Sequence, residues 1–366
     1  MEISRRGFLS VSSALALSAH QCRASADDPT LRWADVRDWG VEGRAFRDTE
    51  AFYDRLPLRA KGVVREAVWN LSRHSAGMMV RFRTDATDIH TDYAVTSSNL
   101  AMPHMPATGV SGLDLYAQDD DGRWKWVAVV APKTQAVRQP IVTGLRQGLR
   151  SYAVYLPLYN GTEFLKLGVP ASAMFEPVRP REDKPIVFYG TSITHGACAS
   201  RPGMPHPSIL GRRLNRPVIN LGFSGNGRME AAVGQFLTEI DAAAFVIDCL
   251  PNMNAEEVTA NTLPLVRQIR MVHGSVPIIL VEDRSYSGSW LLDSQRLRNE
   301  SSRNALRAQY QQLLDAGVEK LSYIDGESLL GTDRDDTTDG SHPSDLGFQR
   351  HADAMEPVLR NALGAA

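Results

Sequence analysis

The sequence has few cysteines, no excess of positive charge and, beyond its first residues, no long apolar run. Three cysteines in 366 residues are too few for a disulfide framework. We expect Cys198 and Cys249 to be buried free thiols, with a disulfide between them as the alternative. A formal net charge of −2 leaves no broad positive field, which argues against a nucleic-acid partner. With 43% hydrophobic and 22% charged residues, the composition is that of an ordinary globular protein.

The first residues resemble an export signal. The twin arginines Arg5 and Arg6 precede a moderately apolar stretch at residues 11–19, and small residues follow at 24–26. This pattern is typical of a twin-arginine (Tat) signal peptide that is cleaved after about Ala26. We therefore expect residues 1–26 to be removed and the mature protein to be periplasmic or secreted, without a stable membrane span. A disordered or membrane-anchoring N-terminus, or lipid attachment at Cys22, is the alternative.

The length favours two domains, and residues 27–178 have the pattern of short strands separated by turns. Apolar residues alternate in part through residues 77–96, around a turn at 85–88. Turn signals also lie between two further pairs of strands: Asp119-Asp120-Asp121-Gly122 between residues 113–116 and 124–130, and Asn160-Gly161 between residues 152–158 and 163–169.

No long amphipathic helix interrupts this region, so it predicts an all-β sandwich or jelly-roll domain. The acidic run at Asp119 lacks the alternating ligand spacing of a calcium loop, so we interpret it as a turn rather than a cation site. A proline-containing linker is expected at residues 174–183.

From residue 184 the pattern changes to strands that alternate with helices. Short apolar runs predict strands at residues 186–189, 218–221, 244–248, 276–281 and 321–325. Helical periodicity predicts helices at residues 207–214, 229–240, 255–273, 302–316 and 348–363. Such alternation produces right-handed crossovers and a parallel sheet covered on both faces. We therefore expect residues 184–366 to form a three-layer α/β/α domain.

A serine, a histidine and an aspartate are candidates for catalysis. Ser192 follows the first predicted strand directly, and open parallel sheets bind ligands at the carboxyl ends of their strands. His342 precedes the last predicted helix, and imidazole is the usual base for a serine nucleophile. Asp339 lies three residues earlier on a glycine-containing turn, from which it can orient the ring. The alternative is that Asp339 and His342 only cap the helix that follows.

Two further signals follow neighbouring strands of the predicted sheet. Residues 222–227 contain three glycines, which leave backbone N–H groups free to face a ligand. Asn252 follows the third strand. Each signal alone is equally typical of a turn.

Residues 184–366 resemble the SGNH (GDSL-like) hydrolase superfamily of esterases and lipases, which has a flavodoxin-like fold. Its four signature blocks occur here in order: Gly190-Thr191-Ser192-Ile193-Thr194, Gly225 within Asn220-Leu221-Gly222-Phe223-Ser224-Gly225, Asn252, and Asp339-Gly340-Ser341-His342. The N-terminal half contains Gly112-Leu113-Asp114-Leu115-Tyr116, which resembles the Gly-x-Asp-Leu-Tyr motif of a subgroup with a β-sandwich ahead of the hydrolase domain.

The resemblance implies that Ser192 is the nucleophile, His342 the base and Asp339 its orienting acid. It also implies an oxyanion hole made by the backbone N–H groups of Ser192 and Gly225 and by the side-chain amide of Asn252. Neither a metal nor a cofactor is expected, and no zinc-ligand spacing is visible. Two positions depart from the family pattern, since Thr191 replaces the usual acid and Met253 the usual Asp, which loosens any inference about the substrate.

Five further residues are candidate substrate contacts. His195 is three residues past Ser192, and His104 lies in a proline-rich loop of the β region that can overhang the site. Arg284, Tyr286 and Trp290 belong to the loop after the fourth strand. For His195 the alternative is a structural hydrogen bond, and for the other loop a solvated surface.

These patterns together predict an exported esterase that removes small acyl groups, such as acetyl, from carbohydrate. A lipid-directed esterase or thioesterase is one alternative, and it predicts a large apolar pocket beside Ser192. A non-catalytic carbohydrate-binding protein with a vestigial hydrolase domain is the other.

Overall fold

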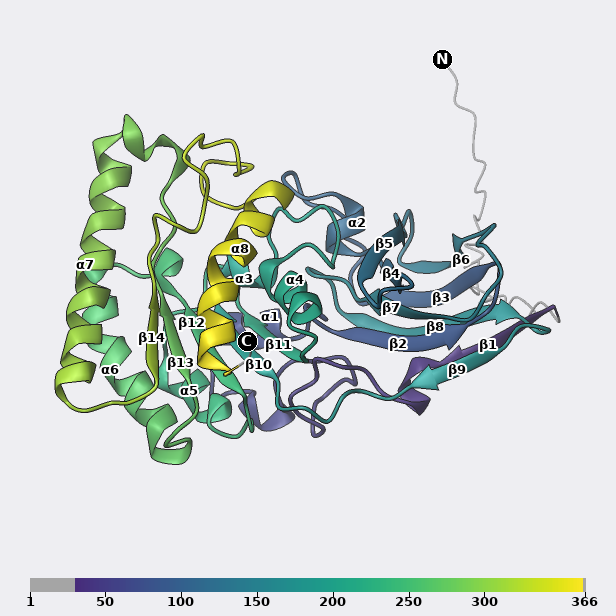
Figure 1. The fold of residues 1–366 in the computed structure, drawn as a ribbon, viewed down its shortest axis with the longest axis horizontal. Helices are drawn as coiled ribbons and strands as arrows, with labels where there is room; N and C mark the ends of the chain where they lie inside the picture. Colours follow the sequence, from purple (N-terminus) through teal and green to yellow (C-terminus); the bar gives the residue numbers. More distant parts are fainter. Residues whose placement is uncertain (1–29, 365–366) are drawn as a thin grey trace, which may run out of the picture.

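The structure, a computed structural model, describes residues 30–364. An antiparallel β domain and an α/β domain lie side by side, and the last helix crosses the front of the α/β domain (Figure 1). The predicted signal peptide lies outside the described residues. Within them, both Cys198 and Cys249 are buried free thiols, as expected. None of the helices in this range is long and apolar enough to cross a membrane.

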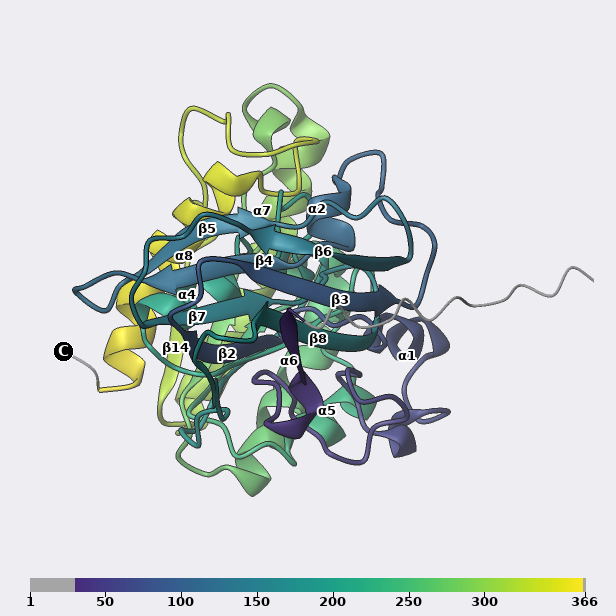
Figure 2. The same cartoon turned by 90° about the vertical axis from the view of Figure 1, so that its right-hand side faces the viewer.

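The β domain is a jelly roll, as the sequence predicts. Its two antiparallel sheets (Figure 2) have the strand orders β1-β8-β3-β6 and β5-β4-β7-β2-β9. They enclose one apolar core. The strands are β1 (Leu31–Asp35), β2 (Met79–Thr84), β3 (Ile89–Val95), β4 (Asp114–Gln118), β5 (Trp124–Val129), β6 (Ala136–Val142), β7 (Arg150–Tyr155), β8 (Thr162–Pro170) and β9 (Phe175–Val178).

The hairpin expected at Asn160-Gly161 is wrong. β7 pairs with β2 and β4, whereas β8 pairs with β1 and β3, so the connection between them crosses from one sheet to the other. The buried Asn160 accepts a hydrogen bond from the N–H of Ser97 (3.0 Å) and donates one to the carbonyl of Ser97 (2.9 Å). Asn160 therefore ties two loops together. By contrast, the Asp119 turn joins β4 to β5 as expected, and β9 occupies part of the expected linker.

The α/β domain contains a parallel sheet in the order β11-β10-β12-β13-β14, the flavodoxin-like arrangement. Its strands are β10 (Ile186–Gly190), β11 (Val218–Gly222), β12 (Ala244–Asp248), β13 (Ile278–Val281) and β14 (Leu321–Ile324). The helices are α3 (Ser192–His195), α4 (His206–Arg213), α5 (Ala231–Leu237), α6 (Ala255–Val272), α7 (Asp293–Asp315) and α8 (Asp345–Ala362). All five predicted strands and five predicted helices are confirmed within a few residues, except that α7 begins nine residues early.

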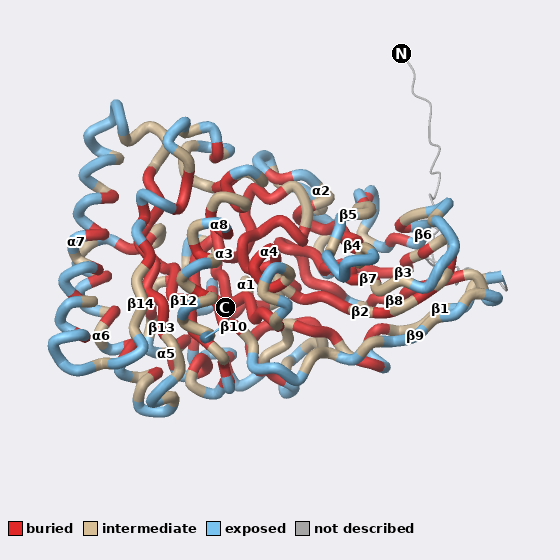
Figure 3. Tube along the Cα trace, in the orientation of Figure 1, coloured by how far each residue is buried: buried red, intermediate tan, exposed pale blue. Residues whose placement is uncertain are grey.

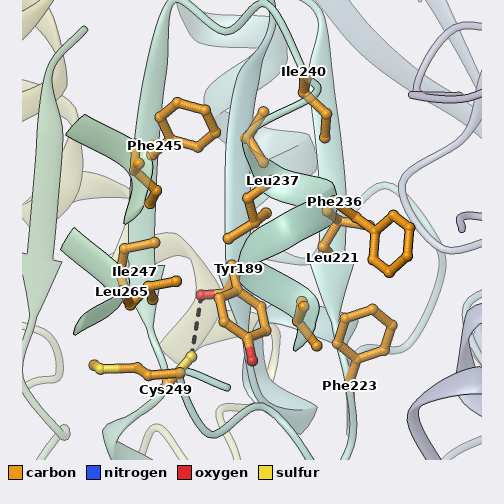
Figure 4. Packing of buried hydrophobic residues seen from close by; sticks show 14 of the residues in the cluster. Tyr189, Leu221, Phe223, Phe236, Leu237, Ile240, Phe245, Ile247, Cys249 and Leu265 are labelled. Carbon is orange, nitrogen blue, oxygen red and sulfur yellow. Dashed lines mark hydrogen bonds between the residues drawn. The ribbon is translucent and has the colours of Figure 1, made fainter. Parts of the chain in front are cut away.

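Alternate side chains of each strand point to opposite faces, so the sheet is covered on both sides. Val187 and Tyr189 pack with α5, α6 and α7 on one face, and Figure 4 shows Tyr189 in the same cluster as Phe236 and Leu265. Phe188 packs with α4 and α8 on the other face. Figure 3 shows the buried strands between helices that are exposed on their outer sides. This burial explains why the strands appear as continuous apolar runs.

A segment between β1 and β2 differs from expectation. Residues 43–76, called here the bridging segment, contain a short 3₁₀ helix, η2 (Leu58–Ala60), and helix α1 (Glu66–Ser72) instead of strands. Its apolar residues join the core of the α/β domain, where Phe46 packs edge-on against Phe236 at 6.4 Å between ring centroids. The bridging segment thus extends one helical layer of the hydrolase half, although it precedes most of the β domain in sequence.

Candidate active site

Ser192 begins α3 just past the carboxyl end of β10, an interior strand of the sheet. Thr191 caps this helix, because its hydroxyl oxygen accepts the N–H of Ile193 at 3.2 Å. Gly190 permits the tight turn, since a Cβ there would lie 2.0 Å from Thr194 Oγ1. The serine is 7% exposed, so neighbouring residues cover most of it.

His342 and Asp339 continue a chain of hydrogen bonds from Ser192. Ser192 Oγ lies 2.8 Å from His342 Nε2, and His342 Nδ1 lies 2.7 Å from Asp339 Oδ2. The second oxygen of Asp339 accepts the backbone N–H groups of Ser341 (3.0 Å) and His342 (2.7 Å). We assign the ring proton to Nδ1, because the carboxylate can only accept there, and Nε2 is then free to accept the serine proton.

Opposing effects act on the carboxyl group of Asp339. Burial raises its pKa, but hydrogen bonds from the backbone and ring of His342 and from the backbone of Ser341 outweigh burial. The net result is a lowered pKa, so Asp339 is a carboxylate at neutral pH and acts as a stable acceptor for the ring.

The three groups expected to form the oxyanion hole each have an N–H group that is free to donate. The N–H of Ser192, as the first residue of α3, has no intrahelical acceptor. Gly225 is exposed, adopts a φ of +68° and donates no backbone hydrogen bond within residues 30–364. The side-chain oxygen of Asn252 is assigned toward the N–H groups of Asn226 (3.0 Å) and Gly227 (3.2 Å), which leaves its NH2 group free. Gly227 in turn packs so closely on Gly190 that a Cβ would lie 1.9 Å from the Gly190 carbonyl oxygen.

Arg284 is not a substrate contact, contrary to the expectation. The side chain is buried, forms an ion pair with Asp283 and hydrogen-bonds the hydroxyl group of Ser341. It also donates to the carbonyl of Ser341 at 2.8 Å. Arg284 therefore supports the loop that carries Asp339 and His342 from below.

His195 is also buried and does not reach the site. Its Nε2 lies 2.7 Å from the carbonyl oxygen of Leu158, and its ring stacks on Tyr159 at 4.1 Å. Burial, followed by the charge of Arg55, lowers the pKa of His195 well below the ordinary value, so the ring is neutral. The structure therefore supports the alternative given for His195, a structural hydrogen bond.

The remaining predicted contacts lie at different distances from the catalytic groups. His104 is exposed on a β-domain loop, and its ring centroid is 6.5 Å from that of His342. The ring of Tyr286 lies 4.2 Å from the Arg284 guanidinium. Trp290 is 72% exposed at the end of η4 (Ser287–Trp290) and lines a groove with Arg296 and Glu300. His104 thus has a ring contact with His342, and substrate contacts of His104, Tyr286 and Trp290 stay predictions.

Asp114 lies in the Gly-x-Asp-Leu-Tyr motif and has a structural role that its sequence context does not indicate. This fully buried carboxylate accepts hydrogen bonds from the N–H of Gly203 (2.8 Å), Arg201 (3.0 Å) and the Trp126 indole (2.9 Å). Arg201 and Gly203 belong to the loop that follows α3, the helix that Ser192 begins. The motif therefore attaches the β domain to this loop.

A second buried carboxyl group bonds to the helix that Ser192 begins. Asp248, at the end of β12, accepts a hydrogen bond from Thr194 Oγ1 at 3.1 Å. Burial raises its pKa to about 8 from the ordinary 3.8. Between these values the folded protein holds a proton on Asp248 that the unfolded chain releases, so this group lowers stability as pH rises from about 4 to about 8.

Asp248→Asn is expected to remove that pH dependence, because the amide is neutral at every pH and can still accept from Thr194. As the pH rises from about 4 to about 8, Asp248 lowers the free energy of unfolding of the wild type by at most about 1.4 kcal/mol per pH unit. Urea unfolding at pH 5 and pH 8 measures both proteins. Equal pH slopes for wild type and variant would contradict the raised pKa.

One group of metal-binding residue types occurs within residues 30–364. Ligand atoms of Cys198, Asp339 and His342 lie within 4.8 Å of one another. Asp339 and His342 are already bonded to each other, and burial raises the pKa of the Cys198 thiol to about 11. A metal would have to displace the proton of the Cys198 thiol and the proton that His342 shares with Asp339. The arrangement therefore fits a proton relay better than a metal site.

Comparisons with known proteins agree with this geometry. A family model for the GDSL-like lipase/acylhydrolase family matches residues 183–360, and one for the N-terminus of SGNH-hydrolase-type esterases matches residues 31–175. A search of curated proteins found no match.

Solved structures include relatives of nearly full length. A protein from Bacteroides ovatus ATCC 8483, described as a GDSL-like lipase, is 31% identical with a TM-score of 0.87, covering 92% of this chain and 99% of its own. A family two carbohydrate esterase from Cellvibrio japonicus is 12% identical with a TM-score of 0.60, covering 91% and 98%. An acetyl xylan esterase from Butyrivibrio proteoclasticus is 11% identical with a TM-score of 0.54, covering 91% and 99%. The last two share the fold alone. From the family matches and the first of these relatives, the chain belongs to the GDSL-like lipase and acylhydrolase (SGNH) family and is an ester-hydrolysing enzyme.

Proposed function

We propose that this chain is an exported serine esterase that removes small acyl groups, acetyl foremost, from carbohydrate. The observation that carries the proposal is the unbroken chain of hydrogen bonds from Ser192 through His342 to Asp339, at 2.8 Å and 2.7 Å. Such a chain is the arrangement that activates a serine hydroxyl for attack on an ester.

In the first half of the reaction, Ser192 Oγ attacks the ester carbonyl carbon while His342 Nε2 takes the hydroxyl proton. The N–H groups of Ser192 and Gly225 and the amide of Asn252 donate to the oxyanion that forms. Loss of one such donor typically costs about 3 kcal/mol of transition-state stabilisation. As the tetrahedral intermediate collapses, the imidazolium returns its proton to the leaving alcohol.

In the second half, water attacks the acyl group on Ser192. His342 takes a proton from this water and returns it to Ser192 as the carboxylic acid leaves. Asp339 stays ionised throughout, holds the ring proton at Nδ1 and stabilises the imidazolium that forms twice in the cycle.

The similarity to an acetyl xylan esterase supports acetyl as the acyl group. A lipid-directed esterase would instead need an apolar pocket for a long chain beside the nucleophile. The similarity to a family two carbohydrate esterase and to an acetyl xylan esterase supports carbohydrate as the alcohol part of the substrate.

The substrate proposal is tested with matched esters. We expect kcat/KM to fall from p-nitrophenyl acetate to butyrate and to octanoate, and we expect acetate release from acetylated xylo-oligosaccharides. A preference for octanoate or triglyceride would favour the lipid-directed alternative. Aryl acetate hydrolysis without acetate release from any acetylated glycan would contradict the carbohydrate part, and binding of glycans without any hydrolysis would indicate a vestigial hydrolase domain.

Export rests on the twin arginines Arg5 and Arg6 and on the small residues before Ala26, which lie outside the described residues. Processing after about residue 26 and recovery outside the cytoplasm are expected, and both should be lost when the two arginines are replaced by lysine. Full-length protein confined to the cytoplasm would contradict export.

A further inference from the structure

The bridging segment reaches the loop that carries Gly225. This loop, residues 222–227, is called here the oxyanion loop. Gly225 itself is not held by packing, because it is exposed and a Cβ built on it would have no neighbour within 4 Å. The position of its N–H group must therefore be fixed by contacts of the residues on either side.

Arg55 of the bridging segment fixes the start of the oxyanion loop. Its buried guanidinium donates to the carbonyl oxygens of Asn220 (3.1 Å) and Gly222 (2.7 Å) at the end of β11. On its own segment it donates to the carbonyl oxygens of Leu71 (2.6 Å) and His74 (3.0 Å). All four acceptors are backbone groups, so Arg55 joins two backbones that are far apart in sequence.

Arg65 fixes the other end of the loop. Its guanidinium donates to the side-chain oxygen of Asn226 at 2.6 Å and to the backbone carbonyl of Asn226 at 3.0 Å. It also donates to both carboxylate oxygens of Glu230, at 2.5 and 3.1 Å, where helix α5 begins. Asn226 follows Gly225 directly. Its N–H donates to the carbonyl oxygen of Phe223 at 2.8 Å and also faces the side-chain oxygen of Asn252 at 3.0 Å. Arg65 therefore holds a residue that adjoins Gly225 and contacts Asn252.

We propose that Arg65 is a positioning residue for the oxyanion hole, so that the bridging segment contributes to catalysis as well as to packing. The proposal rests on the esterase mechanism proposed above. Donors to an oxyanion act only as charge develops in the transition state, so their misplacement lowers kcat and has little effect on KM. A displacement of about 1 Å can cost about a hundredfold in rate.

The test compares two arginines of the bridging segment. Arg65→Met keeps most of the aliphatic side chain and removes every donor; kcat is expected to fall about tenfold to a hundredfold, with KM changed less than about threefold. Arg65→Lys keeps one charged donor, so its kcat is expected to lie between that of wild type and that of Arg65→Met. Arg59→Met is the matched control, since Arg59 is similarly exposed (47% against 41%) and pairs with Asp48 and Glu239 instead of the oxyanion loop. Its kcat should stay within about twofold of wild type.

A boronic acid that forms a tetrahedral adduct with Ser192 provides a second readout. Its affinity should fall in Arg65→Met by about the same factor as kcat, because the adduct uses the same donors. The urea midpoint of each variant shows whether it is folded under the assay conditions.

Four outcomes would overturn the proposal: an unchanged kcat in Arg65→Met, a rise in KM alone, unchanged boronic acid affinity, or an equal loss of kcat in Arg59→Met. Failure of the esterase mechanism itself is distinguishable, because in that case Ser192→Ala would retain activity whatever Arg65→Met does.

Discussion

Replacement of Ser192 by alanine is expected to lower kcat for ester hydrolysis by about 10⁵- to 10⁶-fold. Ser192 Oγ is the group that His342 Nε2 faces at 2.8 Å, so the variant leaves the base without a nucleophile to activate. The oxyanion donors and the substrate-binding groups remain, and they would leave a residual acceleration of about 10³-fold over water. Steady-state release of p-nitrophenol from p-nitrophenyl acetate measures the loss.

Ser200→Ala is the control for this substitution. Ser200 lies on the loop that follows α3, and its N–H and hydroxyl both bond to Asp345 instead of a catalytic group. We expect the control to keep kcat within about threefold of wild type, since it loses one partly buried hydrogen bond. If Ser192→Ala retained more than about 1% of wild-type kcat, the nucleophile would have to be another group.

Much of the α/β domain was predictable from local sequence. Its strands are buried on both faces, so β10 and β12 appear as apolar runs that a polar or glycine-containing turn ends abruptly. Three of the four signature blocks lie at the ends of β10, β11 and β12, and the topology of a parallel sheet brings such strand ends together. For this reason the neighbourhood of Ser192 and Asn252 could be predicted without any knowledge of distances, whereas the place of His342 followed from the family resemblance.

The pairing of β strands and the bridging segment could not be predicted in this way. The two residues Asn160-Gly161 are typical of a hairpin, but they connect strands of different sheets because the buried Asn160 bonds to Ser97, 63 residues away. Likewise, the apolar residues of the bridging segment pack on strands more than 100 residues later. Contacts between residues far apart in sequence decide the strand pairing and the place of the bridging segment. The local sequence pattern holds no information on such contacts.

Substrate contacts were the least predictable part of the site. His195 directly follows a signature block and Arg284 follows the fourth strand, and both positions favour a role at the surface of the site. Both are instead buried, where Arg284 bonds to Ser341 and His195 to Leu158. A polar side chain near a nucleophile can support the loop or face the substrate, and only its direction distinguishes these roles. His104 differs because a loop of the β domain brings it to His342.

Replacement of Asp339 by asparagine is expected to lower kcat by about 10⁴-fold. One carboxylate oxygen accepts from the N–H groups of Ser341 and His342, while the other accepts from His342 Nδ1. Asparagine has a single oxygen, for which two backbone donors compete with one imidazole. With that oxygen facing the backbone, its NH2 group faces Nδ1 and can only donate, so the ring proton moves to Nε2. Nε2 then has no lone pair for the hydroxyl of Ser192, and the general base is lost.

The change should affect kcat far more than KM, because Asp339 is proposed to act through His342 and not on the substrate. Asp345→Asn is the control: Asp345 lies six residues later and bonds to Ser200, so its kcat should stay within about tenfold of wild type. The tautomer of His342 can be read directly from the ring nitrogen signals in NMR. If kcat of Asp339→Asn fell while the ring proton stayed on Nδ1, the tautomer argument would be wrong, and the carboxylate would act by stabilising the imidazolium charge.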